Sequence, residues 1–296
     1  MKKNWMDYSV FCGLFDIRVY EGECLEVMDL MIEDNYKFQM ILCDLPYGTT
    51  ECKWDKVIDL KLLFEKYKQL ITDDGAIVLF ASQPFTTDLI NAGRDLFKYE
   101  LIWDKIKPGG FVSAKLKPLK QHEAVLVFSK GVTANGSKRN MKYYPQMRKA
   151  EGKNIRPINN GSSLSEAVLN ERKSMRIAKS DKDYDPTMRY PYSILKFGSQ
   201  VGECNNSNRL HPTQKPVELL KYLIETYTKK GDRVLDNCSG SGSTAVACLE
   251  TERSFIGIEM DRKYMEISNR RLTEMMCDKR DREMGYGKYA NLFTNL

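Results

Sequence analysis

The sequence lacks the features that mark a metalloprotein, a disulfide-linked protein or a membrane protein. Its eight cysteines include no Cys-x-x-Cys pair, and its only two histidines, His122 and His211, lie far apart in the chain. No zinc site and no disulfide framework are therefore expected, and we interpret the cysteines as reduced thiols. No run approaches the roughly 20 apolar residues of a membrane span, and the short apolar run between Asp7 and Asp16 is unlike a signal peptide. We expect a cytoplasmic, metal-free protein with no membrane partner.

Charge is distributed unevenly along the chain. With 296 residues, 42% of them hydrophobic, the chain can bury one full-sized core. The net charge is +6, but residues 131–196 hold 14 Lys and Arg against 6 Asp and Glu. That segment is also interrupted by Pro145, Pro157 and Pro186. We interpret it as an inserted, loop-rich module whose basic surface binds a polyanion.

Outside residues 131–196, short apolar runs alternate with segments of helical spacing. Strands are predicted at residues 15–20, 38–43, 76–80, 99–103, 124–128, 233–235 and 254–258. Helices are predicted at 24–34, 59–71, 217–227, 242–250 and 263–276, and a turn at Asp73-Asp74-Gly75. This alternation predicts an α/β fold: a doubly wound, mostly parallel, Rossmann-like sheet of seven strands. The predicted division is 1–130, the insertion 131–196, and 197–296.

A glycine-rich turn in the second half has the character of a cofactor loop. Residues 234–244 combine a strand, a turn with Gly240 and Gly242, and a helix start, where free N–H groups can meet a ligand. Glu259 ends the next strand 17 residues after Gly242. An acidic side chain at that place can accept hydrogen bonds from ribose hydroxyls. A nicotinamide-binding enzyme shares these features, so this half alone leaves the cofactor open.

The first half contains a short motif suited to an amino-group acceptor. Asp44-Leu45-Pro46-Tyr47 follows the predicted strand 38–43, which places Asp44 at a strand's carboxyl end. An adenine amino nitrogen is a poor nucleophile, but hydrogen bonds to Asp44 and to the Leu45 or Pro46 carbonyl would favour a pyramidal, more nucleophilic nitrogen. Tyr47 can stack on a base that has left the duplex. The four residues are therefore predicted to be catalytic.

Together these motifs resemble those of a known family. Asp44–Tyr47 resembles the Asp-Pro-Pro-Tyr signature of amino-methyltransferases, and residues 236–244 resemble their S-adenosylmethionine loop. His-Pro-Thr-Gln-Lys-Pro at 211–216 closely matches the segment before that loop in the beta group of DNA amino-methyltransferases. In that group the catalytic motif comes first, the target-recognition region second and the cofactor motif last, as here. The resemblance, over residues 14–130 and 190–275, implies a methyltransferase fold, double-stranded DNA as partner and methylation of adenine N6.

The resemblance also implies which residues bind S-adenosylmethionine. Glu23 and Cys24 would contact its adenine, Thr213 and Lys215 would lie near its methionine carboxylate, and Glu259 would take the ribose. Asp236, Ser239 and Gly240 would hold the methionine part. The remaining members of the expected set are Asp44, Cys238, Ser241, Gly242 and Met260. Leu45 stands where the family usually has proline, Cys238 where it has phenylalanine, and Glu23 where it has aspartate.

Several alternatives stay open at this point. Cytosine-N4 methyltransferases share the fold but usually have serine in place of Asp44, which favours adenine. RNA or protein amino-methyltransferases commonly place an Asn-containing motif after the cofactor loop, unlike this chain. A DNA-binding protein on an inactive methyltransferase scaffold would not need Asp44, Pro46, Tyr47, Gly240 and Glu259 intact. The sequence leaves open the recognition site, a homodimer and a cognate restriction enzyme.

Overall fold

A mixed sheet organises the chain, whose computed structural model describes residues 7–12, 15–48, 57–150, 187–198 and 214–283. Its strands are, in spatial order, β1 (Asp7–Cys12), β2 (Phe15–Glu21), β11 (Ser254–Glu259), β10 (Arg233–Asp236), β3 (Phe38–Cys43), β4 (Ile71–Ala81), β6 (Lys120–Phe128), β5 (Phe97–Gly109) and β9 (Ile194–Lys196). The strands from β2 to β4 are parallel, whereas β6 runs antiparallel to both its neighbours. The predicted mostly parallel α/β sheet is confirmed, but the described residues form nine strands of it instead of the predicted seven.

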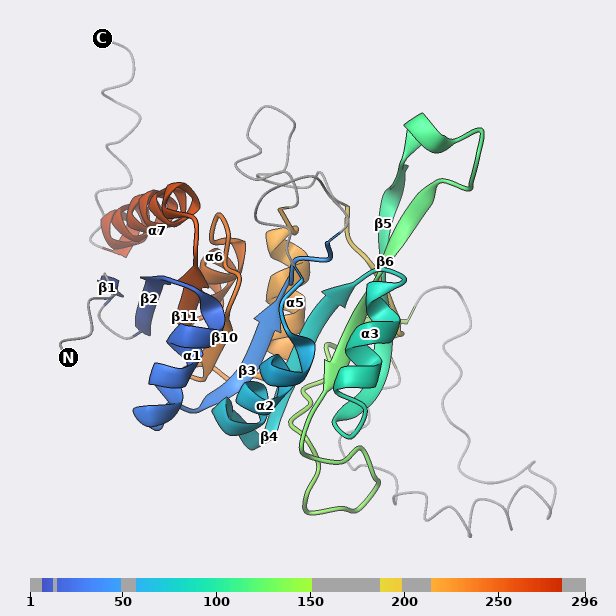
Figure 1. Cartoon of the computed structure of the whole chain (residues 1–296), viewed down its shortest axis with the longest axis horizontal. Helices are drawn as coiled ribbons and strands as arrows, with labels where there is room; N and C mark the ends of the chain where they lie inside the picture. Colours follow the sequence, from blue (N-terminus) through green and yellow to red (C-terminus); the bar gives the residue numbers. More distant parts are fainter. Residues whose placement is uncertain (1–6, 13–14, 49–56, 151–186, 199–213, 284–296) are drawn as a thin grey trace.

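Helices cover both faces of the sheet, as a doubly wound fold requires. One face carries α1 (Cys24–Glu33), α2 (Leu60–Leu70) and α3 (Phe85–Ala92), and the other carries α5 (Val217–Tyr227), α6 (Ser243–Glu250) and α7 (Arg262–Glu283) (Figure 1). Acidic side chains start two of them: Glu23 accepts from the Glu26 amide and Asp59 from the Leu62 amide, each at 3.0 Å. Such caps satisfy amides that the helix leaves unpaired. Within the described ranges, no helix is both long and apolar enough to span a membrane.

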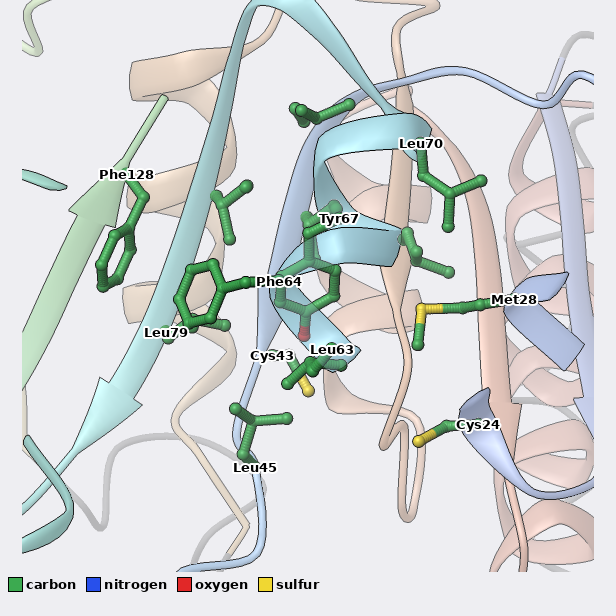
Figure 2. Close-up of a cluster of buried hydrophobic side chains, with 14 of the residues drawn as sticks. Cys24, Met28, Cys43, Leu45, Leu63, Phe64, Tyr67, Leu70, Leu79 and Phe128 are labelled. Carbon is green, nitrogen blue, oxygen red and sulfur yellow. The ribbon is translucent and has the colours of Figure 1, made fainter. Parts of the chain in front are cut away.

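The core between α1–α3 and the sheet fixes the ends of two strands. Figure 2 shows Met28, Phe64 and Tyr67 grouped with Cys43 and Leu79, and all five are buried. The Tyr67 hydroxyl donates to Asn237 Oδ1 at 2.6 Å, in the loop after β10. Burying one such side chain contributes about 1.5–3 kcal/mol. The cluster therefore holds the carboxyl ends of β3 and β10 side by side.

The predicted turn at Asp73-Asp74-Gly75 was wrong, because these residues lie within β4. Pairing with β3 passes from Phe38–Ile71 to Met40–Ala76, so β4 carries three extra residues there. A Cβ on Gly75 would lie 2.8 Å from the Gln39 carbonyl oxygen, so the bulge accepts only glycine without rearrangement. Bulges and turns favour the same small and polar residues, which explains the error.

The described flanks of the predicted insertion belong to the main body. The Lys142 amide donates to the Asp74 carbonyl at 2.8 Å, and the Tyr144 amide donates to the Thr226 carbonyl at 2.7 Å. β9 extends the main sheet, while β7 (Arg148–Lys149) and β8 (Met188–Arg189) form a small ribbon of their own. Residues 151–186 lie outside the described part of the chain, so the division at 131 and 196 stays a prediction.

Candidate active site

The motif Asp44-Leu45-Pro46-Tyr47 leaves the carboxyl end of β3, as predicted. Leu45 is buried in the core, which anchors the motif, whereas Asp44 and Tyr47 are half-buried at the edge of the sheet. The Tyr47 hydroxyl donates to Asp44 Oδ1 at 2.9 Å. The Tyr47 ring stacks on Phe85, the first residue of α3, with 5.1 Å between the ring centroids. The edge of open α/β sheets at which Asp44 lies is the usual place for a ligand.

A buried ammonium group links this motif to the neighbouring hairpin. Lys215 lies just before α5, with its Nζ 2.6 Å from Asp44 Oδ2 and 3.4 Å from Glu123 Oε2. Glu123 lies on β6 and also pairs with Lys105 of β5. The Lys215 ammonium lies 5.1 Å from the centroid of the Phe80 ring. Asp44, Lys215, Glu123 and Lys105 thus form one continuous chain of alternating charges, which we call the charge chain.

Burial and charge compete within the charge chain, and charge prevails. Burial would raise the pKa of Glu123, but Lys215 and Lys105 outweigh it and hold that pKa below its usual range. Burial would lower the pKa of Lys215, but Asp44 and Glu123 raise it above the ordinary lysine value. Both groups are therefore charged near neutral pH. Asp44 accepts one bond on each oxygen, which leaves lone pairs for a further donor because a carboxylate has about four acceptor sites.

The glycine-rich loop follows β10 at the same edge of the sheet. Gly240 and Gly242 have φ angles of 51° and 80°, in the left-handed region that favours glycine. A Cβ on Gly242 would come 2.1 Å from Ser268 Oγ, so α7 packs directly against the turn. Asp236 accepts from the Cys238 amide at 3.1 Å and from Thr244 Oγ1 at 2.6 Å, which closes the loop. Burial raises the pKa of Asp236 to about 6.

Glu259 joins this loop to the end of β2. Its Oε2 accepts from the Gly240 amide at 2.7 Å, and its Oε1 accepts from the Asp261 amide at 2.8 Å. The Gly22 amide, just before Glu23 and Cys24, donates to the Glu259 carbonyl at 3.0 Å. Burial raises the pKa of the Glu259 carboxyl, and the amide bonds oppose that effect. The structure thus brings together Glu23, Cys24, Gly240 and Glu259, which the resemblance to the family assigns to one cofactor site.

The residues of this site fit a nucleoside that carries an amino acid. A Cβ on Gly240 would meet no atom within 4 Å, so the loop backbone is open to a ligand at close range. The buried Ser239 hydroxyl finds no hydrogen-bond partner among the described residues. Each Glu259 oxygen accepts one amide and keeps a lone pair for a ribose hydroxyl. Those are the donors and acceptors that S-adenosylmethionine requires.

The other predicted cofactor residues have varied surroundings. Ser241 is buried and its carbonyl accepts from Arg271 of α7, Cys238 packs against the core, and Met260 is 61% exposed. The Lys215 ammonium donates to Asp44 Oδ2, and its expected place near the methionine carboxylate stays a prediction. Thr213 lies outside the described residues. In the described ranges, no cluster of three or more His, Cys, Asp or Glu could hold a metal.

Sequence reasoning missed Glu123, Phe85 and Asn237. Glu123 stands directly before the predicted strand at 124–128, next to His122. The signal available in the sequence was the single carboxylate of Glu123 directly before the apolar run at 124–128. Phe85 and Asn237 gave no signal, because their partners Tyr47 and Tyr67 lie far from them in the sequence.

Comparison with known proteins connects this geometry to a family. A family model described as DNA methylase, of the N6 and N4 type, matches residues 38–270. Type II methyltransferase M1.MboII of Moraxella bovis is 25% identical over 270 residues, which cover 85% of this chain and 95% of that protein. Type II methyltransferase M2.MboI of the same organism is 43% identical over 75 residues, 25% of this chain and 28% of that protein. Three relatives of higher local identity, M2.MboI among them, are matched over only 26–30% of their own length.

Solved structures share the fold. The crystal structure of the M1.HpyAVI–SAM complex superimposes with a TM-score of 0.57 at 24% identity, and the match covers 86% of this chain and 98% of that one. At this identity the likeness shows a common fold. The family model spans the Asp44 motif, the charge chain and the glycine-rich loop. The chain belongs to the N6/N4 DNA methylase family.

Proposed function

We propose that the chain transfers a methyl group from S-adenosylmethionine to the N6 amino group of adenine in double-stranded DNA, after the base has left the duplex. The observation that carries this proposal is the position of Asp44. Its carboxylate lies at the same sheet edge as the glycine-rich loop and Glu259, and Tyr47 and Lys215 orient it. A methyl donor and an amino acceptor would therefore meet at this edge.

The chain's own residues would activate the amino group. Asp44 would accept one N–H through a lone pair that Tyr47 and Lys215 leave unused, and the Leu45 or Pro46 carbonyl would accept the other. Both bonds favour a pyramidal nitrogen whose lone pair would form the bond to the methyl carbon as the bond from that carbon to the sulfonium sulfur breaks, after which the nitrogen releases one proton to solvent. A preorganised acceptor of this kind contributes about 100-fold or more in rate. Tyr47, already supported by Phe85, would hold the base by stacking.

S-adenosylmethionine supplies the electrophilic methyl group when it is bound. Glu259 would accept bonds from its ribose hydroxyls, Glu23 and Cys24 would border its adenine, and Ser239 and Gly240 would border its methionine part. The support for this assignment is the unpaired Ser239 hydroxyl and the open space above Gly240. M1.HpyAVI, a protein of the same fold, was crystallised in complex with the same ligand.

Two features support the choice of substrate. Aspartate at position 44 favours adenine, whereas serine is usual in cytosine-N4 enzymes; cytosine N4 is the second candidate because the family includes both types. The basic residues 131–196 would form the target-recognition region, and their contacts with phosphate would make binding fall steeply with salt. The relatives named type II methyltransferases support a cognate restriction enzyme. The expectation of a homodimer rests only on the resemblance to the family.

Asp44→Ala tests the catalytic role. Methylation is followed with radiolabelled S-adenosylmethionine, and the modified base is identified by mass spectrometry of digested DNA. We expect N6-methyladenine from the parent and a loss of about 100-fold in the single-turnover rate of the variant, with cofactor binding retained. N4-methylcytosine from the parent would contradict adenine, and a variant of parental rate would contradict the role of Asp44. Asp44→Ser is expected to lower adenine methylation without creating cytosine methylation, because pocket shape also selects the base.

A further inference from the structure

The β5–β6 hairpin extends beyond the sheet edge at which Asp44 lies. β4 ends at Ala81, which pairs with Ala124, and β6 continues outward through residues 120–123. At about 3.3 Å per residue this arm alone rises roughly 13 Å above the end of β4. β5 accompanies it as far as the Gly109–Lys120 pair, and the tip lies further out. Figure 1 shows the hairpin projecting from the body above α3.

The tip of the hairpin is apolar, and the charged residues of the hairpin between Asp104 and Glu123 are all lysines. Phe111 is 68% exposed and Leu116 is 88% exposed, and Val112 between them is fully exposed. Between Asp104 and Glu123 the sequence has five lysines and no acidic residue. An exposed apolar group of this size usually marks an interaction surface. The lysines favour a polyanion as the partner, because an ordinary protein surface carries both signs of charge.

The base of the hairpin belongs to the active site. Glu123 on β6 and Lys105 on β5 are members of the charge chain, so both arms are tied through Lys215 to Asp44. The side chain of Lys120, at the outer end of β6, also contacts Ser82 just after β4. The hairpin therefore begins directly beside Asp44.

Local bonds give the hairpin a defined shape. Asp104 Oδ1 accepts from the Ile106 amide and from Gln121 Nε2, each at 2.9 Å, which joins the two arms. Pairing shifts between Asp104 and Gly109, so β5 carries a bulge there, and a bulge bends the strand that contains it. Gly110, with φ of 87°, starts the short helix Phe111–Ser113 (η1) at the tip. The apolar residues are therefore presented on a structured turn.

We propose that this hairpin is a probe for duplex DNA: Phe111 and Val112 enter the base stack next to the target base, and Lys115 and Lys117 contact the flanking phosphates. The inference rests on the proposed function and deepens it. A base that leaves the duplex breaks stacking on both sides, and apolar side chains commonly fill such a gap. The hairpin brings such side chains to the edge of the active site without any contribution from residues 151–186.

Two DNA duplexes distinguish this role from general DNA binding. Both carry the recognition site, found by sequencing with modified-base detection; in one the target base is paired, and in the other it lies opposite an abasic position. Phe111→Ala should slow single-turnover methylation of the paired duplex by about tenfold, the lower range for one stacking contact. Methylation of the abasic duplex should change less than about threefold, because little stacking or pairing is left to break. Leu62→Ala, an exposed apolar residue on α2, serves as the matched control and should affect neither duplex.

Lysine variants test the phosphate contacts. Lys117→Ala should weaken DNA binding and reduce the slope of log affinity against log salt by about 1, whereas Lys230→Ala, at the opposite edge of the sheet, should leave both unchanged. Equal effects of Phe111→Ala on the two duplexes, or none on either, would overturn the probe. So would a change in oligomeric state with unchanged DNA methylation, since the tip would then bind protein. A parent that binds DNA but does not methylate it would refute the proposed function. The comparison of Lys117→Ala with Lys230→Ala in DNA binding would still test whether the hairpin contacts DNA.

Discussion

Replacing Lys215 by methionine removes the one cation between Asp44 and Glu123 while keeping the length of the side chain. Both carboxylates lie within 3.4 Å of its ammonium, and Lys215 is only 9% exposed. Breaking a buried ion pair from one side typically costs about 3–5 kcal/mol. We expect a loss of stability of that size, which is large beside the total of about 5–15 kcal/mol of ordinary domains.

Activity should fall for a separate reason. Asp44 and Glu123, both partly buried and left with Lys105 as their remaining partner in the charge chain, would then favour a shared proton, as other close carboxyl pairs do. That proton would occupy the acceptor lone pairs that the amino group of the base needs. The single-turnover rate of Lys215→Met should therefore drop by about 100-fold at neutral pH and recover partly as the pH rises and the shared proton is lost.

The parent should behave differently over the same range. The lowered pKa of Glu123 stabilises the fold above the unfolded glutamate value and loses that contribution in acid. The raised pKa of Lys215 stabilises it below the unfolded lysine value and loses that contribution in strong alkali. Glu123 and Lys215 are thus both charged between about pH 5 and 10, and they should add no pH dependence to the parental rate there.

Glu123→Gln supplies the second half of a double-mutant cycle. With one carboxylate removed, the double variant Lys215→Met/Glu123→Gln has no carboxyl pair, so it should regain most of the stability lost by Lys215→Met. Chemical denaturation measures the loss of stability, and single-turnover assays from pH 6 to 9 measure the change in rate. A Lys215→Met protein with a pH profile parallel to the parent's, or additive losses of stability in the double variant, would refute the reasoning.

Two further predictions concern the glycine-rich loop. Glu259→Ala should weaken S-adenosylmethionine binding by about 1.5–3 kcal/mol, the value of a hydrogen bond to a charged group, in calorimetry without DNA; equal affinities would place the ribose elsewhere. Burial raises the pKa of Asp236 to about 6, so raising the pH from 5 to 8 ionises this carboxyl in the folded protein and destabilises the parent. The asparagine of Asp236→Asn does not ionise, so the stability of this variant relative to the parent should increase by about 1.4 kcal/mol over that range. Urea unfolding at the two pH values measures the difference, and a constant difference would speak against the raised pKa.

The sequence predicted those elements whose signal is local and apolar. The strand at 38–43 and the helix at 217–227 have the predicted bounds, because each carries a continuous or helically spaced apolar pattern between clear stops. The position of Asp44 followed directly, since a strand's end also fixes the edge of the sheet. The glycine-rich loop was equally accessible, because Gly240 and Gly242 adopt φ angles that few other residues tolerate.

Elements that leave the body of the protein could not be predicted in the same way. β5 was expected only at 99–103 but runs from Phe97 to Gly109. Its outer residues pair with β6 while largely exposed to solvent, so they carry no apolar alternation. Periodicity reports burial, and a projecting hairpin has little of it. For the same reason, a prediction based on patterns of buried residues does not detect the exposed tip of the hairpin with its apolar residues and lysines.

The charge chain explains why a lysine is useful beside an acceptor carboxylate. The charge chain as a whole is neutral, because Lys215 and Lys105 offset Asp44 and Glu123, and the Asp44 carboxylate is the member placed to stabilise the positive charge that moves onto the amino nitrogen during methyl transfer. If Lys215 were neutral, the two carboxylates would bind a proton in its place and the charge chain would again be neutral. The net field would be similar, but the proton would occupy an acceptor that the base requires. Lys215 instead donates to Asp44 Oδ2 from one side and leaves the remaining lone pairs unprotonated. In this arrangement Lys215 contributes to catalysis by keeping a proton off the two carboxylates. The pH profile of Lys215→Met is therefore more informative than its rate at any single pH.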